Sequence, residues 1–290
     1  MKSVLITGGS GAFGTAFARF LLNYNPHIPS RIGIFSRSEH RQAEMARELA
    51  PLDTQSRLRF FIGDVRDRER LRRAMEGMEV VIHAAALKRI EVGAYNPLEV
   101  KKTNIDGAAN VIEAAKDAHV ARVVALSTDK AFEPISPYGT SKAFAESLFL
   151  AANNTSGWDG PRFAVVRYGN VWNSTGSVVP TWRNIISLHT RFEEPIVPVT
   201  DPECTRFFMT MDQAVQLVFD TALHMIGGET IIPDLPAYRL GDLATAMGAK
   251  MEIKGLPGYE KRHESMGPGN SSDKARRLGI DELKAILCST

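Results

Sequence analysis

The chain of 290 residues predicts an α/β protein with a doubly wound parallel sheet and a small, discontinuous C-terminal lobe. Three observations support this fold class. Short β-branched runs alternate with amphipathic stretches as far as residue 168, and a glycine-rich turn separates the first run from the first amphipathic stretch. The alternation stops after residue 168, so the remainder is expected to build the lobe.

The expected strands are almost continuously apolar, which is typical of strands covered on both faces. They are Ser3–Thr7, Arg31–Ser36, Leu58–Ile62, Val80–His83, Arg122–Ser127 and Arg162–Tyr168. Amphipathic periodicity predicts helices near Phe13–Asn23, His40–Leu49, Arg66–Met75, Pro97–Ala118 and Tyr138–Asn153. Strands and helices that alternate in this way form a parallel sheet with helices on both faces.

The second part of the chain has weaker signals. Prolines and a glycine punctuate residues 170–206, which are expected to be rich in loops, and residues 251–290 read as polar and irregular. Between them we expect a helix near Asp212–Met225, a strand near Glu229–Pro233 and a helix near Leu240–Met247. We therefore expect a cofactor-binding domain in residues 1–169, with 207–228 packing back on it, and a substrate lobe from 170–206 and 229–290.

Composition narrows the class of protein. Hydrophobic residues make up 44% and charged residues 23%, as in soluble globular proteins, and the net charge of +2 gives no sign of a nucleic-acid partner. Cys204 and Cys288 fit neither a disulfide framework nor a metal site. The N-terminal apolar run is too short for a signal peptide, and no stretch reaches the ~20 residues of a membrane helix. We expect a soluble, cytoplasmic homo-oligomer without metal, membrane or nucleic-acid partners.

A glycine-rich turn, Thr7-Gly8-Gly9-Ser10-Gly11-Ala12-Phe13-Gly14, lies between the first expected strand and helix. Its glycines would allow a tight turn and a close approach to a pyrophosphate, which the helix N-terminus would face. A bare tight turn is the alternative, but the position within a βαβ unit favours a dinucleotide. We expect it to contact Thr7, Gly8, Ser10, Gly11, Ala12, Phe13 and Gly14. The G-x-x-G-x-x-G spacing resembles the short-chain dehydrogenase/reductase branch of Rossmann proteins.

The second expected strand ends without the acidic residue that would bind the ribose diol of NAD. Ser36-Arg37 stands there, and Arg41 follows one helical turn later, so a 2′-phosphate could be paired. Arg37 as a solvated loop arginine is the alternative, but we favour NADP. Asp64 and Val65, after the third strand, would flank the adenine. Ala84, Ala85 and Ala86, after the fourth strand, would let the cofactor approach closely.

Ser127 and Thr128 end the fifth strand, and Tyr138 and Lys142 follow at a spacing that places both on one helical face. Lys142 beside Tyr138, with a cationic nicotinamide, would lower the pKa of the tyrosine. Such a tyrosine can take a carbinol proton as hydride leaves for the cofactor. A Tyr/Lys pair alone would mean little, but after a strand-end Ser-Thr it predicts a redox site that uses Ser127, Tyr138 and Lys142.

Asp129 and Lys130 add an acid and an amine that a simple dehydrogenase or epimerase does not need. A dehydratase needs both groups, because it removes a proton beside a ketone and protonates a departing hydroxyl. We expect Lys130 to be the base, with a pKa lowered by desolvation, and Asp129 to be the acid. A structural ion pair is the alternative.

The chain resembles the inverting UDP-N-acetylglucosamine 4,6-dehydratases, extended short-chain dehydrogenases/reductases that begin pseudaminic-acid and related surface-sugar pathways. The resemblance runs from residue 1 to about residue 266. Its segments are Phe35–Arg37, Phe60–Asp67, His83–Lys88, Tyr95–Glu99, Lys102–Asn104, Ser127–Lys130, Arg167–Val171 and Thr205–Phe207. Retaining dehydratases place Asp-Glu where this chain has Asp129-Lys130, so the resemblance implies inversion at C5.

The resemblance also implies further site residues. Lys88 and Asn104 would lie near the cofactor, and the UDP-sugar would meet Lys88, Thr128, Asn170, Val178, Arg206 and Glu264. The chain departs from the family at Asn173 and Thr175, at Phe132-Glu133 and in the run Pro257–Glu264. These departures concern the substrate side, so the resemblance is firmer for the hydride chemistry than for the identity of the sugar.

Two other functions fit part of the sequence. An NADP-dependent nucleotide-hexose 4-epimerase or reductase would use Tyr138 and Lys142 and leave Asp129 and Lys130 structural. A non-catalytic NADP-binding sensor would keep the fold but needs none of these acid–base groups.

Overall fold

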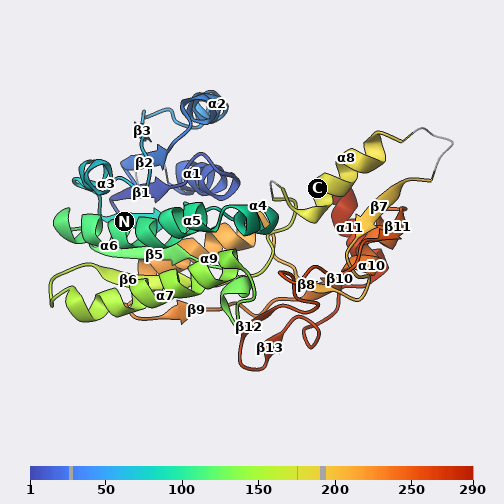
Figure 1. The fold of residues 1–290 in the computed structure, drawn as a ribbon. Helices are drawn as coiled ribbons and strands as arrows, with labels where there is room; N and C mark the ends of the chain where they lie inside the picture. The colour runs from blue at the N-terminus through green and yellow to red at the C-terminus, as the bar shows by residue number, and fades with distance from the viewer. Residues whose placement is uncertain (26–28, 175, 190–193, 290) are drawn as a thin grey trace.

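The computed structural model describes residues 1–25, 29–174, 176–189 and 194–289 (Figure 1). Its centre is a parallel sheet in the order β3-β2-β1-β4-β5-β6-β9. The strands are β1 Ser3–Thr7, β2 Arg31–Ser36, β3 Leu58–Ile62, β4 Val80–His83, β5 Arg122–Leu126, β6 Arg162–Val166 and β9 Thr230–Ile231. The order reverses between β1 and β4, and the carboxyl ends of strands at such a switch point are where nucleotides bind in α/β sheets.

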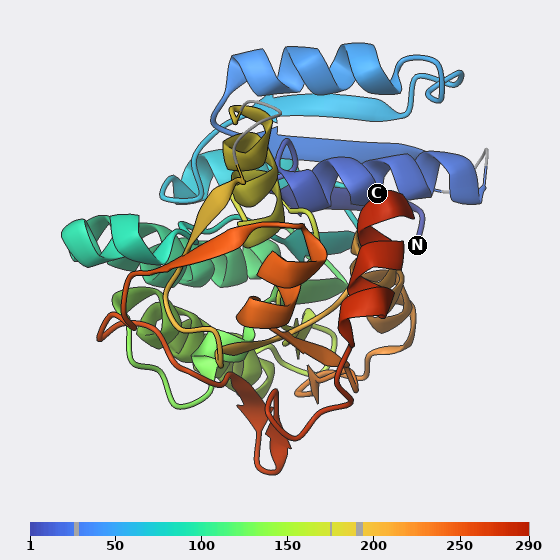
Figure 2. The ribbon, with the colours of Figure 1, turned by 90° about the vertical axis from the view of Figure 1, so that its right-hand side faces the viewer.

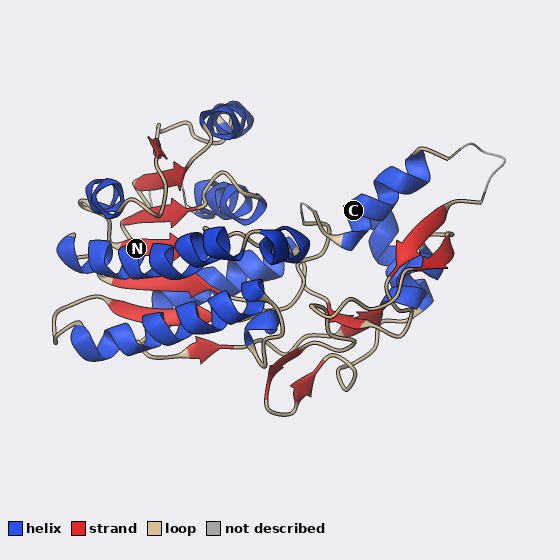
Figure 3. Cartoon of the chain, viewed as in Figure 1, coloured by secondary structure: helices blue, strands red, loops and turns tan. Residues whose placement is uncertain are grey.

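Helices cover both faces of this sheet (Figure 3). They are α1 Ala12–Tyr24, α2 Glu39–Leu49, α3 Arg68–Met75, α6 Gly107–Asp117, α7 Pro137–Thr155 and α9 Met211–His224. Helices α1, α2 and α9 share one hydrophobic cluster with the sheet, and α3, α6 and α7 share the other. Val4 and Ile6 face the first cluster and Leu5 the second, because side chains alternate along a strand. Coverage on both faces explains why the strands read as continuous apolar runs.

The predicted helix Pro97–Ala118 is present, but its middle is π-helical. Short helices α4 (Ile90–Tyr95) and α5 (Pro97–Val100) lead into a π-helical segment, η1 (Lys101–Asp106), before α6 begins. A π-helix bonds each residue to the fifth along the chain, and such segments are rare and frequently lie at functional sites.

The lobe lies beyond the carboxyl ends of the sheet strands, and Figure 2 looks onto it. It contains α8 Val178–Ser187, β7 Ile196–Val199, β8 Thr205–Phe207, β10 Ala237–Arg239, α10 Leu240–Ala246, β11 Lys250–Ile253, β12 Ser265–Gly267, β13 Asn270–Ser271 and α11 Ile280–Ser289. Three two-stranded sheets form here: β10 with β8, β11 with β7, and β12 with β13. A third hydrophobic cluster, with Trp172, Trp182, Phe208 and Tyr238, holds it together.

Residues 170–206 are rich in loops as expected, with α8 and β7 between them, whereas the expectation that residues 251–290 are irregular is wrong, because they contain β12, β13 and α11. Strand β7 pairs in parallel with β11, with Ile196 opposite Lys250. The residues next to either strand in sequence do not indicate this pairing. Helix α11 buries Leu283 against the third cluster despite its polar surroundings. No helix among the described residues is long and apolar enough to cross a membrane.

Candidate active site

The glycine-rich turn forms a cradle between β1 and α1. Gly8 has φ +67°, and a Cβ there would lie 2.8 Å from the Cα of Ala85, so the turn packs directly on the segment after β4. A Cβ on Gly14 would lie 2.4 Å from the Gly9 carbonyl oxygen, which fixes the first turn of α1 against the loop. Thr7 and His83 end their paired strands, and their Oγ1 and Nδ1 atoms are 2.8 Å apart. The predicted residues Thr7–Gly14 and Ala84–Ala86 are thus brought together.

Ser36 is held in place at the end of β2. Its Oγ accepts a hydrogen bond from Ser10 at 2.8 Å, and the buried Gln42 donates to its Oγ and carbonyl and to the Phe61 carbonyl. Arg37 and Arg41 are exposed beside it, with no carboxylate within ion-pair distance among the described residues. Sequence reasoning missed Gln42, whose signal was a polar residue on the buried side of an amphipathic helix.

The next strand end differs in detail from the prediction. Asp64 accepts a hydrogen bond from the Arg66 backbone at 3.0 Å, which shapes the turn after β3. The side chain of Val65 is buried in the second hydrophobic cluster.

Asn104 lies in the π-helical segment and is buried. Its Oδ1 accepts from the Leu87 amide at 2.8 Å, and its Nδ2 donates to the Leu87 carbonyl and to Ser141 Oγ. Ser141 in turn donates to the Tyr138 carbonyl. Asn104 therefore ties the segment before Lys88 to the first turn of α7, whereas the Lys88 side chain is exposed.

Tyr138 and Lys142 project from the first turns of α7, which Ser136 caps through the Gly139 amide. Burial raises the pKa of Tyr138 to about 12, although the charge of Lys130 and a hydrogen bond with Thr128 oppose the rise. Burial lowers the pKa of Lys142 to about 8, and its Nζ donates to the Leu126 carbonyl at 2.6 Å. Lys142 is not among the groups that shift the pKa of Tyr138, so the expected lowering, which also needs a nicotinamide cation, stays a prediction.

Asp129 and Lys130 form a one-turn helix, η2 (Asp129–Ala131), directly after β5. Lys130 Nζ lies 3.1 Å from Asp129 Oδ1 and 3.1 Å from Glu264 Oε1. Both carboxylates are at most 2% exposed, and Asp129 Oδ2 and Glu264 Oε2 have no hydrogen-bond partner among the described residues. Thr128 donates to Asp129 Oδ1 at 2.9 Å. An acid, an amine and a second acid thus meet in one buried cluster.

The charge state of Lys130 differs from the sequence expectation. Burial alone would lower the pKa of Lys130, but the carboxylates of Asp129 and Glu264 outweigh it and raise the pKa above its ordinary value. The expected lowering is wrong because the sequence did not show that Glu264 adds a second carboxylate. The two carboxylates therefore favour the ammonium form of Lys130 in this cluster.

Arg206 is a buried guanidinium on β8, 6% exposed. It donates to the Thr205 and Arg262 carbonyls and lies 3.6 Å from a Glu260 carboxylate oxygen. A guanidinium held in this way can present its remaining donors to a diphosphate. Asn170, after β6, has a buried Oδ1 without a partner among the described residues.

The remaining substrate-side residues lie at the start of α8 and in loops. Val178 begins α8 and packs against the third hydrophobic cluster. Asn173 and Glu133 both have positive φ, at 55° and 46°. Thr175 lies outside the described residues.

Arg167 connects helix α7, strand β12 and the ring of Phe132, and it was not predicted as a site residue. Its Nε donates to Glu146 Oε1 on α7 at 2.9 Å, and its Nη2 bonds the other oxygen of the same carboxylate. Its Nη1 donates to the Met266 carbonyl in β12, and its guanidinium lies 5.9 Å from the Phe132 ring centroid. Only the fold could show this, because Arg167 and Glu146 are 21 positions apart in sequence.

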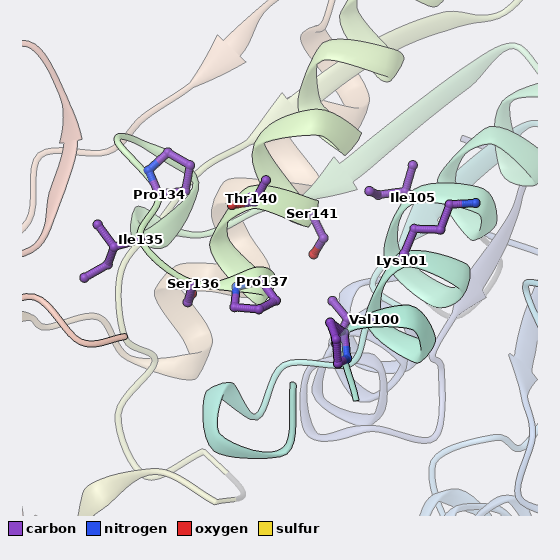
Figure 4. Close-up of a pocket in the computed structure, with 10 residues that line it drawn as sticks. Val100, Lys101, Ile105, Pro134, Ile135, Ser136, Pro137, Thr140 and Ser141 are labelled. Carbon is purple, nitrogen blue, oxygen red and sulfur yellow. The ribbon is translucent and has the colours of Figure 1, made fainter. Parts of the chain in front are cut away.

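Two hollows lie near the start of α7, and the smaller one borders Lys130 and Glu264. A small cavity is lined by Lys130, Ile135, Ser136, Tyr259, Lys261 and Glu264. A larger pocket of about 480 Å³ opens between η1 and the start of α7, with Val100, Lys101 and Ile105 on one side and Pro134 and Pro137 on the other (Figure 4). No group of acidic, His and Cys side chains among the described residues could hold a metal ion.

These features fit a bound dinucleotide. The Gly8 turn leaves no room for a Cβ, α1 begins where a pyrophosphate would lie, and the buried Ser127 Oγ lacks a partner among the described residues. With Tyr138 and Lys142 on α7, the fold and the site define a short-chain dehydrogenase/reductase of the extended type, in which a separate lobe covers the sheet ends. The chain belongs to the polysaccharide biosynthesis protein family, whose profile matches residues 4–279.

The curated relatives include a dehydratase and an epimerase. The UDP-N-acetylglucosamine 4,6-dehydratase (inverting) of Campylobacter jejuni subsp. jejuni serotype O:2 is 45% identical over 269 residues, 91% of this chain and 77% of that protein. A UDP-glucose 4-epimerase of Rickettsia felis is 38% identical over 285 residues, 96% of this chain and 81% of that protein.

Solved structures share the fold. The X-ray structure of Pen from Bacillus thuringiensis superposes with a TM-score of 0.91 at 32% identity and covers 100% of this chain and 98% of its own. DesIV, a dTDP-glucose 4,6-dehydratase from Streptomyces venezuelae solved with NAD and TYD bound, has a TM-score of 0.80 at 22% identity, over 98% and 95% of the two chains. The DesIV likeness concerns the fold alone.

Proposed function

We propose that this protein is a UDP-N-acetylglucosamine 4,6-dehydratase that inverts C5 and yields a UDP-2-acetamido-2,6-dideoxy-4-hexulose. One observation carries the proposal. Asp129, Lys130 and Glu264 converge beside Tyr138, and a hydride-transfer site alone has no use for this buried cluster. The identity to an inverting dehydratase over most of the chain supports the same choice.

The proposed reaction has two parts, hydride transfer at C4 and elimination across C5 and C6. A bound nicotinamide supplies reversible hydride acceptance. Tyr138, as the phenolate that a bound nicotinamide cation would favour, takes the C4 hydroxyl proton, and Lys142, held on the Leu126 carbonyl, fixes the cofactor side of the site. Arg206 holds the diphosphate, so that C4 lies opposite Tyr138.

Elimination follows once C4 is a ketone, because the C5 proton is then acidic. Lys130 removes this proton, Asp129, which enters the step protonated, gives its proton to the departing C6 hydroxyl, and C5 is reprotonated with inversion. Lys130 has to lose its own proton first, since the neighbouring Glu264 carboxylate favours its ammonium form.

The decisive experiment incubates the protein with UDP-N-acetylglucosamine and catalytic NADP and analyses the product by mass. Loss of one water identifies a dehydratase, and turnover in D₂O should place deuterium at C5 of an L-arabino 4-keto product. An isomer of unchanged mass would identify the rival 4-epimerase, and an unaltered substrate would identify a sensor. A dehydrated product with the original C5 configuration would refute inversion.

We also propose that the cofactor is NADP rather than NAD. Exposed Arg37 and Arg41 follow the fixed Ser36, and no acidic side chain occupies the end of β2. Titration of both cofactors should show tighter binding of NADP, and Arg37→Ala should remove the preference. Arg47→Ala, an exposed arginine further along α2, is the matched control and should keep it. Equal affinities in the unaltered protein would refute the proposal.

The cytoplasmic location, the homo-oligomer and the division into domains at residues 169–170, 206–207 and 228–229 stay predictions. Light scattering of the purified protein measures the oligomer.

A further inference from the structure

Glu264 belongs to the lobe, yet its carboxylate lies inside the catalytic cluster. Its Oε1 is 3.1 Å from Lys130 Nζ, and the residue is 2% exposed. Its second oxygen, Oε2, is buried and has no hydrogen-bond partner among the described residues. The family resemblance implies a contact of Glu264 with substrate, whereas the geometry directs this carboxylate at Lys130.

The backbone of Glu264 is fixed on both sides. Its amide donates to Ser272 Oγ at 2.9 Å, and its carbonyl accepts from the Ser272 amide at 2.8 Å. Ser272 is fully buried, and its Oγ lies 2.6 Å from Thr205 Oγ1, which also meets His263 Nδ1 at 2.8 Å. Because Thr205 precedes Arg206, this arrangement joins Glu264 rigidly to the strand that carries the candidate diphosphate ligand.

We propose that Glu264 is the internal proton acceptor of Lys130: it takes a proton from the Lys130 ammonium before elimination and returns it after C5 is reprotonated. This inference rests on the proposed dehydratase function. One N–H bond breaks and one O–H bond forms on Glu264, so the pair stays neutral overall. The electron pair freed on Lys130 Nζ then takes the C5 proton, and no co-reactant is needed.

Other groups around Lys130 are less suited to this exchange. Asp129, on the same turn, also accepts from Thr128 and is required as the acid for the C6 hydroxyl. Arg206 on β8 is a cation, and the phenols of Tyr138 on α7 and Tyr238 on β10 have pKa values raised to about 12 by burial. Of these groups, only Glu264 has a carboxylate in contact with Lys130 and no other step of the reaction assigned to it.

The proposal makes Glu264 a positioning residue with a distinct pH signature. While Glu264 accepts the proton, neutral Lys130 forms without release of a proton to water, so kcat is independent of pH around neutrality. In Glu264→Gln the proton has to leave for solvent. Then kcat at neutral pH should fall about 10²–10⁴-fold and rise about tenfold per pH unit, with KM little changed. Glu264→Asp keeps the charge and should keep a flat profile at a lower rate.

The matched control is Glu260→Gln, which loses the same charge on the same segment but faces Arg206. Its kcat profile should stay flat, whereas its KM changes. A flat profile in Glu264→Gln, or a loss confined to KM, would overturn the proposal. If Glu264→Gln does not fold, a sloping profile in Glu264→Asp would overturn it equally. An unaltered protein that releases no water from UDP-N-acetylglucosamine would refute the proposed function itself, a result visible before any variant is made.

Discussion

Replacing Lys142 by Met removes an ammonium that the fold holds away from water. The side chain is 6% exposed, and burial lowers its pKa from 10.5 to about 8, with the Glu146 carboxylate opposing the shift. Each pKa unit corresponds to ~1.4 kcal/mol, so below pH 8 the charged lysine destabilises the fold by about 3 kcal/mol. The hydrogen bond to the Leu126 carbonyl offsets about 1 kcal/mol of this at any pH.

The sign of the pH dependence follows from proton counting. Between pH 8 and 10.5 the unfolded chain binds more protons than the folded chain, so the stability of the unaltered protein rises with pH. From about pH 6.5 to about pH 9.5 the penalty falls by about 2 kcal/mol, and the variant has no such penalty. The unfolding free energy of the unaltered protein minus that of Lys142→Met should therefore rise by about 2 kcal/mol over this range.

Urea unfolding without cofactor at both pH values measures this difference. Lys284→Met, an exposed lysine on α11, is the control and should show no change with pH. Parallel stability curves for the unaltered protein and Lys142→Met would refute the reasoning, because the lysine would then titrate alike in the folded and unfolded chains.

Three further predictions concern binding and chemistry. Tyr138→Phe lacks the phenol that accepts the C4 proton, so cofactor reduction in a single turnover should slow by about 10²–10⁴-fold; an unchanged rate would place the base elsewhere. Gly8→Ala would put a Cβ 2.8 Å from the Ala85 Cα at φ +67°. The turn would have to leave its cradle conformation to relieve ~1–2 kcal/mol of backbone strain, so calorimetry should show cofactor binding weakened about tenfold. An unchanged Kd would contradict the role of the turn as a cradle. Arg206→Ala should raise KM for the sugar nucleotide with kcat near normal; an unchanged KM would count against its diphosphate role.

The sheet and its flanking helices could be predicted because their signals are local. Strands such as Ser3–Thr7 are apolar on both faces, and the glycine turn marks the start of α1 to within one residue. The small sheets of the lobe could not be predicted in the same way. Ile196–Val199 pairs with a strand that begins at Lys250, and two four-residue strands carry too little pattern to be matched across that distance.

In the candidate site, too, some residues could be predicted from the sequence and some contacts could not. Tyr138, Lys142, Asp129 and Lys130 follow strand ends or share a helical face, so their proximity could be inferred from spacing. The contact between Lys130 and Glu264 depends on how the lobe folds back, and it reverses the expected direction of the lysine pKa shift. Charged residues far apart in sequence are usually solvated, so their burial against each other is visible only in the fold.

Arg167 sets a condition for recombining this chain with a relative of different sugar selectivity. Its guanidinium is shared between Glu146 on α7, the Met266 carbonyl in β12 and the ring of Phe132. A chimera that imports the C-terminal segment alone would keep the carbonyl, which every sequence supplies, but would change the side chains that set its position. Exchange of the lobe is therefore expected to succeed only when Arg167, Glu146 and Phe132 come from one parent. These three positions have to be exchanged together with the lobe.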